Sequence, residues 1–125
     1  MAVLGFEHVG IQVKHIENSI TFYKEIVGLE LLDQFLHTDG KMKLAFLGMN
    51  KKVIVELIEG YNPNLPEEGK VHHVAFLVSD IEAEKKRLEK LEVEWIFPEP
   101  TRLPNGARYI FFKGPEGEWI EFYEK

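Results

Sequence analysis

Hydrophobic residues follow two different periods in the first part of the chain. Residues 3–13 are rich in Val, Ile and Phe, which predicts a strand whose side chains alternate between two faces. Over residues 15–27 the apolar positions recur at spacings of four and three, which predicts a helix with one apolar stripe. Asn18 and Ser19 are candidate N-terminal caps, and Gly28 stands where a helix C-terminal glycine belongs.

Three strands are predicted to complete the first half of the chain. They are expected at residues 29–36, 43–47 and 52–58. Asp39-Gly40 is a hairpin signal between the first two of them. Residues 60–69 contain two prolines and two glycines, and residues 61–69 are predicted to be a linker.

The second half repeats this order of elements. Its strand, helix and three strands are predicted at 71–78, 80–91, 94–97, 108–112 and 119–124. Asp80 is a candidate N-cap for the helix, and Asn105-Gly106 is the matching hairpin signal. Residues 98–104, which include three prolines, are predicted to be a loop.

Short sequence matches relate the two halves. HVGIQV begins at His8 and HVAFLV begins at His73, 65 positions later. The same shift relates Glu56 to Glu121, each inside an apolar run near the end of its half. The residue identities alone do not prove a repeat, but strands, helix stripe, turns and linker all coincide at this shift.

The length and composition fit one α+β domain built from two βαβββ units. A chain of 125 residues is long enough for a single domain with a sizeable core. We assign that domain to residues 1–125, with units at 1–60 and 70–125 on either side of the linker. The net charge of −6 argues against a nucleic-acid or anionic-membrane partner.

Several other classes of protein are disfavoured by the sequence. It lacks a signal-peptide pattern and a run of about 18 apolar residues, so a cytoplasmic location is expected. It has no cysteine, which excludes disulfides and thiolate chemistry. It also lacks the G-x-x-x-x-G-K-[ST] phosphate loop and the G-x-S-x-G nucleophile motif.

Two histidines and two glutamates form the candidate site. His8 and His73 lie on the first strand of each unit, and Glu56 and Glu121 lie on the last. Each glutamate stands between large apolar neighbours on its face, where an ionised carboxylate is costly unless it is paired or bound to a cation. Imidazole and carboxylate are common ligands of divalent Zn, Ni, Co, Fe or Mn.

The alternative interpretation is that each of these residues is an ordinary core or surface residue. A single histidine or glutamate in a strand usually is, but one shift relating both pairs favours a metal site. The other histidines are not expected to be ligands. His72 should face away from His73 by strand alternation, and His15 and His37 fall at a helix start and in a turn.

These motifs resemble the vicinal oxygen chelate superfamily. The paired HVGIQV and HVAFLV strands, the two βαβββ units and the closing GPEGEWIEFYE carry the likeness, which covers nearly the whole chain. The superfamily includes glyoxalase I, methylmalonyl-CoA epimerase, extradiol dioxygenases, fosfomycin-resistance thiol transferases and bleomycin-binding proteins. The resemblance implies a cupped, barrel-like mixed sheet with helices outside, a divalent metal held inside it, and a homodimer.

The resemblance also implies a ligand set and an activity. Its metal-binding positions correspond to His8, Glu56, His73 and Glu121. This set is similar to that of glyoxalase I (lactoylglutathione lyase), whereas epimerases tend to have glutamine at the position of Glu56. The implied reaction moves a proton between adjacent carbons of a metal-chelated small molecule, such as a thiol or CoA adduct. An epimerase-like enzyme and a non-catalytic drug-binding protein are the alternatives.

Roles for individual residues follow from this resemblance and from residue chemistry. Glu121 is the expected general base and acid, with Glu56 second. Gln12, by strand phase, and Arg108, by charge, are candidates for holding the remote end of the substrate. Many glyoxalase I sequences have arginine where this chain has Gln12, so the thiol need not be glutathione.

Overall fold

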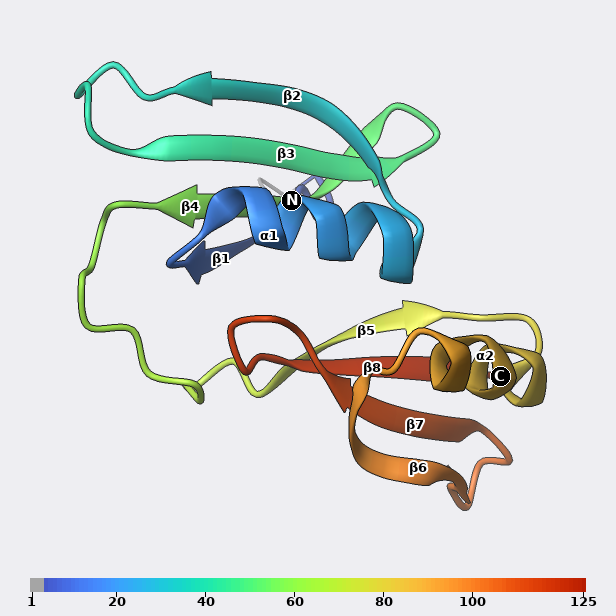
Figure 1. The fold of residues 1–125 in the computed structure, drawn as a ribbon. Coiled ribbons are helices and arrows are strands. Elements are labelled where there is room, and N and C mark those ends of the chain that lie inside the picture. The colour runs from blue at the N-terminus through green and yellow to red at the C-terminus, as the bar shows by residue number, and fades with distance from the viewer. Residues whose placement is uncertain (1–3) are drawn as a thin grey trace. The chain divides into compact units, whose positions relative to one another are not determined.

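The computed structural model describes residues 4–125 and contains two compact units, Met1–Leu65 and Pro66–Lys125 (Figure 1). The first unit contains β1 (Val9–Val13), α1 (Ile16–Phe22), a π-helical turn (Tyr23–Val27), β2 (Glu30–Leu36), β3 (Lys43–Met49) and β4 (Lys52–Glu59). The second unit contains β5 (His73–Leu77), α2 (Ile81–Lys90), β6 (Glu94–Arg102), β7 (Arg108–Lys113) and β8 (Trp119–Glu124). The predicted α+β class and βαβββ repeat are therefore confirmed.

Each unit is a mixed four-stranded sheet. The strand orders are β1-β4-β3-β2 and β5-β8-β7-β6. In both sheets the first strand pairs in parallel with the last, and all other neighbours are antiparallel. The register also repeats, because Gly10 lies opposite Glu56 and Ala75 lies opposite Glu121. The last strand of each unit is therefore interior to its sheet, and the first strand is at an edge.

Each helix packs on one face of its own sheet. The first strand is shorter than the predicted 3–13, since residues 4–8 are not in a strand and residue 3 lies outside the described residues.

The core is formed by fully buried side chains of helix and sheet. The largest are Tyr23, Phe112, Phe122, Ile16, Leu47, Leu57, Ile81, Leu88, Ile110, Ile120, Val13 and Val55.

The first helix begins without a side-chain cap of its own. Its N-cap residue is His15, and Asn18 and Ser19 lie within the helix, so the predicted caps are wrong. The amide of Ile16 instead donates to the Glu59 Oε1 atom on β4, at 2.9 Å. A carboxylate from the last strand thus satisfies one of the amides that every helix start leaves without an intrahelical partner. At the other end Gly28, with φ of 94°, confirms the predicted glycine.

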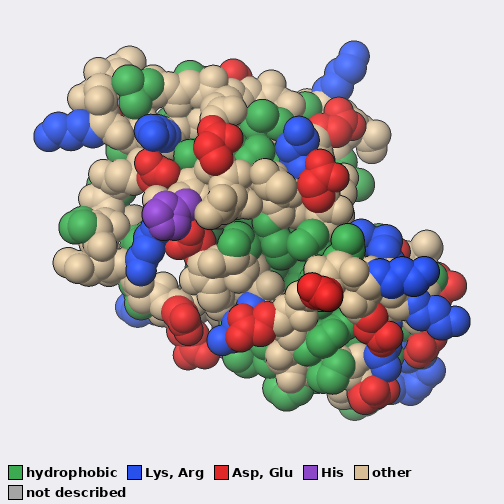
Figure 2. All heavy atoms as spheres, viewed as in Figure 1, with side chains coloured by type: hydrophobic (Ala, Val, Ile, Leu, Met, Phe, Trp, Pro, Cys, Tyr) green, Lys and Arg blue, Asp and Glu red, His purple; other side chains and the backbone are tan. Residues whose placement is uncertain are grey.

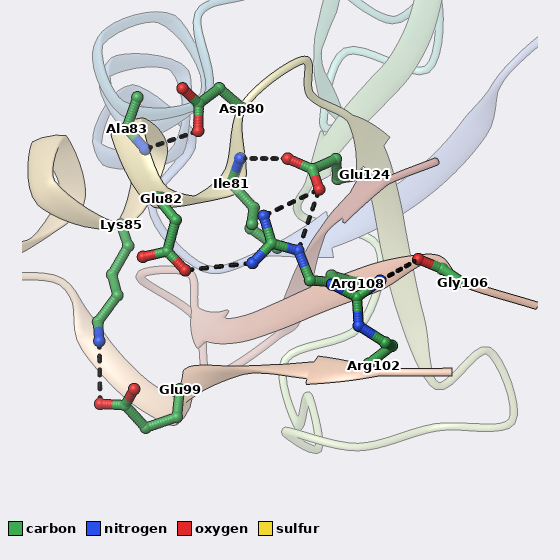
Figure 3. Close-up of polar contacts among 10 residues, drawn as sticks. All are labelled: Asp80, Ile81, Glu82, Ala83, Lys85, Glu99, Arg102, Gly106, Arg108 and Glu124. Atoms are coloured by element: carbon green, nitrogen blue, oxygen red, sulfur yellow. Dashed lines mark hydrogen bonds and ion pairs between the residues drawn. The ribbon is translucent and has the colours of Figure 1, made fainter. Parts of the chain in front are cut away.

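The second helix repeats this anchor and adds a conventional cap (Figure 3). Asp80 accepts a hydrogen bond from the Ala83 amide at 3.2 Å, as predicted. The amide of Ile81 donates to the Glu124 Oε2 atom at 2.9 Å. The Ile81 amide, followed by Arg108, holds the pKa of Glu124 below its ordinary value. Both helices are therefore tied at their N-terminus to a glutamate on the last strand.

A cation on the third strand of each unit completes the anchor. Lys43 lies 3.5 Å from Glu59, and Arg108 lies 3.0 Å from Glu124. Arg108 also contacts Glu82 on α2 at 3.3 Å (Figure 3). These contacts repeat at the same interval along the chain as the histidines do.

One strand is longer than its sequence suggests. The predicted loop at 98–104 is wrong over most of its length, because β6 continues to Arg102. Its pairing with β7 shifts register between Phe97 and Thr101, the interval that contains Pro98 and Pro100. A strand tolerates proline at a sheet edge or a bulge, and β6 provides both.

The surface carries both signs of charge. Figure 2 shows basic and acidic side chains interspersed over the region of α2 on the face in view. None of the helices in residues 4–125 has the length and apolar character that a membrane crossing requires.

Candidate metal centre

The first pair of candidate ligands is formed by His8 and Glu56. His8 lies directly before β1, and Glu56 lies on the neighbouring β4. Gly10 lies opposite Glu56 in the parallel register, and His8, two positions before Gly10, contacts the same carboxylate. The His8 Nε2 atom lies 3.0 Å from the Glu56 Oε1 atom, and both side chains are partly buried.

The second pair has the same construction. His73 begins β5, Glu121 lies on β8, and Ala75 stands opposite Glu121 in the register. The His73 Nε2 atom lies 3.1 Å from the Glu121 Oε1 atom. In both pairs the histidine and glutamate are 48 positions apart in sequence. The small residue at the intervening position, Gly10 or Ala75, leaves room beside the carboxylate.

Each imidazole also rests against a phenylalanine from the third strand. The rings of His8 and Phe46 are 6.1 Å apart at 89°, and those of His73 and Phe111 are 5.0 Å apart at 84°. Edge-to-face contacts of this kind hold a ring in a defined orientation. The second unit extends this surface with Trp119, which contacts Phe111 at 5.5 Å. Phe97 contacts both of these rings, so an aromatic cluster adjoins His73.

Glu121 is the most deeply buried of the candidate ligands. It is only 8% exposed and is one of the few buried polar side chains of the described residues. Burial raises the pKa of its carboxyl group, and the charge and hydrogen bond of His73 offset part of that effect. A carboxylate in this position gains from a nearby cation and has increased proton affinity, so Glu121 suits both metal binding and general-base chemistry.

The orientation predicted for His72 is wrong. The His72 Nδ1 atom lies 2.8 Å from the His73 Nδ1 atom, and the ring of His72 contacts Trp119 at 4.6 Å. Strand alternation does not apply at this position, because β5 begins one residue later, at His73. His72 is therefore a neighbour of the candidate site that sequence reasoning missed.

The two residues expected to contact the substrate lie on different faces of their sheets. Gln12 is exposed on β1, two positions from Gly10 and therefore on the face where Gly10 adjoins Glu56. Arg108 shares the face of β7 with Ile110 and Phe112, opposite to that of Phe111, and there it pairs with Glu82 and Glu124. We assign Arg108 a structural role in anchoring α2, and its predicted role in substrate binding rests on its charge alone.

The donor atoms of each His–Glu pair are of types that bind divalent cations. Within residues 4–125 no group of three or more His, Cys, Asp or Glu side chains lies close enough together to hold a metal ion. Each pair nonetheless presents an imidazole nitrogen and a carboxylate oxygen toward one another, which are the ligand types that Zn, Ni, Co, Fe and Mn accept. Since protein metal sites normally use at least three protein ligands, one pair alone is insufficient.

The sequence matches one family over nearly its whole length. Residues 5–122 match the Glyoxalase/Bleomycin resistance protein/Dioxygenase superfamily. The chain therefore belongs to this superfamily, and its two βαβββ units are those of the vicinal oxygen chelate fold.

Individual relatives are consistent with this membership. The chain is 50% identical over 121 residues to the uncharacterized protein YwbC of Bacillus subtilis, covering 95% of this chain and 96% of that protein. It is 30% identical over 122 residues to a probable lactoylglutathione lyase of Vibrio cholerae, covering 94% and 88%. The trypanothione-dependent glyoxalase I of Leishmania major has a similar structure, with a TM-score of 0.73, 26% identity, and coverage of 94% and 84%.

Proposed function

We propose that the protein is a metal-dependent lyase or isomerase of the glyoxalase I type. The observation that carries the proposal is the repeated His–Glu contact, at 3.0 Å in the first unit and 3.1 Å in the second. The similarity to lactoylglutathione lyases supports the choice of reaction class. We further propose a cytoplasmic homodimer with a small-molecule substrate, for which the family resemblance is the support.

The proposed ligands are His8, Glu56, His73 and Glu121. The two histidines supply neutral imidazole nitrogens, and the two glutamates supply carboxylate oxygens that balance the charge of the ion. When bound, a divalent cation would act as a Lewis acid toward two neighbouring substrate oxygens. Ni, Zn, Co, Fe and Mn all accept this ligand set.

The protein's own chemistry is a proton transfer, which we assign to Glu121. Its carboxylate takes a proton from one substrate carbon and returns it to the adjacent one. Burial helps because it raises the pKa of this carboxyl group and so increases its proton affinity. Glu56, which is paired with His8 in the same manner, is the second candidate for this role.

The aromatic side chains beside the second pair favour a substrate with an apolar portion. Phe97 is half exposed, and it lies with Phe111 and Trp119 on the face that carries His73. Such a surface can remove water from the neighbourhood of the carboxylate. Gln12 on the first unit offers a neutral amide to the polar portion of the substrate.

The test is an assay with the hemithioacetals that methylglyoxal forms with glutathione and with other small thiols. The purified protein is stripped with a chelator and reloaded separately with each of the five metals. We expect thioester formation that depends on the added metal and is lost in Glu121→Gln. Metal-dependent epimerisation of methylmalonyl-CoA in place of thioester formation would identify the alternative enzyme. Tight ligand binding with neither reaction would contradict an enzymatic role.

A further inference from the structure

Both ring nitrogens of His73 have a partner in the protein. The Nε2 atom faces the Glu121 Oε1 atom at 3.1 Å, and the Nδ1 atom faces the His72 Nδ1 atom at 2.8 Å. The three side chains thus form a continuous chain from an exposed imidazole to a buried carboxylate. The arrangement includes His72, which is not one of the four proposed ligands.

Among these three side chains, the ring nitrogen that carries the His73 proton determines which ring nitrogen of His72 must carry its proton. A carboxylate only accepts hydrogen bonds, so with Glu121 ionised the neutral His73 carries its proton on Nε2. Its Nδ1 atom then accepts from His72, whose proton is on Nδ1. If the His73 Nε2 atom binds a cation, the His73 proton must move to Nδ1, and His72 must become the acceptor. A neutral imidazole can serve in either role because its two tautomers interconvert.

We propose that His72 is a positioning residue that determines which ring nitrogen of His73 carries the proton. It thereby controls the availability of the Nε2 lone pair for a metal ion, an inference that rests on the proposed function. Metal-binding histidines generally donate their second ring N–H to a nearby acceptor, which fixes the tautomer and the orientation of the ring. His72 supplies that acceptor from the preceding position in the chain.

Packing holds His72 in place for this task. Its ring lies 4.6 Å from that of Trp119 and 5.1 Å from that of His73, at 63° and 87° respectively. Phe111 contacts it at 6.5 Å. These rings also contact each other, so the orientation of His72 is defined although its side chain is exposed.

The first unit has an analogous arrangement with a different partner. Glu7 occupies the position that corresponds to His72, and its Oε1 atom lies 3.7 Å from the His8 Nδ1 atom. This nitrogen is buried and has no hydrogen-bond partner within the described residues. The Glu56 carboxylate can only accept, so without metal a neutral His8 carries its proton on Nε2. Glu7 can likewise only accept, so it suits a proton that moves to Nδ1 when Nε2 binds a cation. Glu7 can therefore act only as an acceptor, whereas His72 can act as a donor or as an acceptor.

The first test observes the tautomers directly in metal-free protein by long-range ¹H–¹⁵N correlation spectra of the histidine rings at about pH 8, where histidines are neutral. We expect the proton of His72 on Nδ1 and that of His73 on Nε2. Loading with Zn²⁺ should move the His73 proton to Nδ1 and the His72 proton to Nε2. A His72 that carries its proton on Nε2 without metal, or that shows a mixture of both tautomers, overturns the proposal.

The second test measures affinity for Co²⁺ by competition with a chelator. His72→Phe keeps the ring against Trp119 but removes the acceptor, so affinity should fall about 10- to 100-fold. His72→Asn restores an acceptor near the position of Nδ1 and should bind within about threefold of wild type, since second-shell effects depend on that contact. His37→Phe, a change in the β2–β3 turn, is the matched control and should leave affinity unchanged.

The two tests separate this inference from the proposed function. If wild-type protein binds no metal, the proposed function fails, and the metal-free tautomers still decide the role of His72. If circular dichroism shows that His72→Phe is unfolded, the affinity of His72→Asn and the wild-type NMR spectra decide the role of His72. Equal Co²⁺ affinity in His72→Phe and wild type overturns the inference while leaving the metal site intact.

Discussion

At the residue scale, Glu121 combines a cost in stability with a benefit for chemistry. Its carboxylate is buried on an interior strand, where it contacts His73. The same burial that raises its pKa makes its ionised form unfavourable in the folded protein. Residues with this property are often retained because the reaction requires them.

Replacement of Glu121 by glutamine should therefore have opposite effects on activity and stability. Glutamine keeps a hydrogen-bond acceptor for His73 but cannot exchange a proton, so turnover should fall by about 10²- to 10⁴-fold. The metal-free variant should melt a few degrees higher than wild type at neutral pH, because no buried charge remains. Glu30→Gln, on the exposed face of β2, is the control and should change neither quantity.

The stabilisation in Glu121→Gln should also depend on pH. A carboxyl group with a raised folded-state pKa contributes stability below its unfolded-state pKa, and this contribution is lost as pH rises through the folded-state value. The stability difference between variant and wild type should therefore grow as pH rises from the ordinary carboxyl pKa through the raised value. Denaturant titrations of metal-free protein at a series of pH values measure it. A difference that is constant with pH would show that burial of the charge is not its cause.

Individual residues were predictable where strand phase applied and not elsewhere. The alternation of side chains placed His73 and Glu121 on one face, and their contact agrees with it. His72 lies just outside β5, where alternation has no meaning, so its contact with His73 could not be inferred. The partners of Arg108 could not be inferred either, because Glu82 and Glu124 are 26 and 16 positions away and sequence spacing does not relate them.

At the scale of the elements, the glutamate anchors replace the caps that the sequence suggested. Ser19 and Asn18 looked like caps because helix starts favour such residues, but the helix begins earlier, at Ile16. Glu59 and Glu124 supply the missing acceptor from another strand. The internal repeat relates these two glutamates and was the signal that could have identified them. The extension of β6 was likewise hidden, because prolines usually end a strand.

Loss of an anchor should destabilise its helix. Glu59→Ala removes the acceptor for the Ile16 amide and the partner of Lys43, and should cost about 1 kcal/mol, as the loss of an N-cap does. Glu59→Gln keeps an acceptor oxygen and should cost less. Urea unfolding followed by circular dichroism measures both changes. Equal stability of Glu59→Ala and wild type would show that the α1 start needs no anchor.

The anchor in the second unit should respond to acid. The pKa of Glu124 is held low by the Ile81 amide and by Arg108, so its contribution to stability is present above the ordinary carboxyl pKa. That contribution is lost as pH falls through the lowered pKa. Glu124→Gln should therefore be less stable than wild type at neutral pH and approach it in acid. A difference that persists unchanged to low pH would contradict this assignment.

At the scale of the whole molecule, the proposed ligand set draws on two residues from each unit. Either double variant, His8→Ala with Glu56→Gln or His73→Ala with Glu121→Gln, leaves only two ligands and should bind Co²⁺ at least about 100-fold more weakly. Equilibrium dialysis measures the loss. Full binding by either variant would mean that the two pairs are not ligands of one ion.

A mixture of the two double variants tests whether all four ligands of one ion come from a single chain or from two copies of the chain. Only a shared site regains one intact set of four when the variants are refolded together. Wild type refolded in the same way is the control. The repeat of hydrophobic periods along the sequence predicts the two βαβββ units. It does not predict association between chains, because that depends on surface residues that follow no such period.

The constant intervals inside the two units restrict how the gene can change in length. From histidine to glutamate the interval is 48 positions in both halves, and from helix start to anchoring glutamate it is 43 in both. One inserted residue within a strand would turn every later side chain in that strand to the opposite face and separate the pair. The side chains of the two halves differ at most positions, whereas these intervals are equal. Insertions and deletions should therefore be tolerated in the segment that joins the units, and within a unit only where another change restores the count.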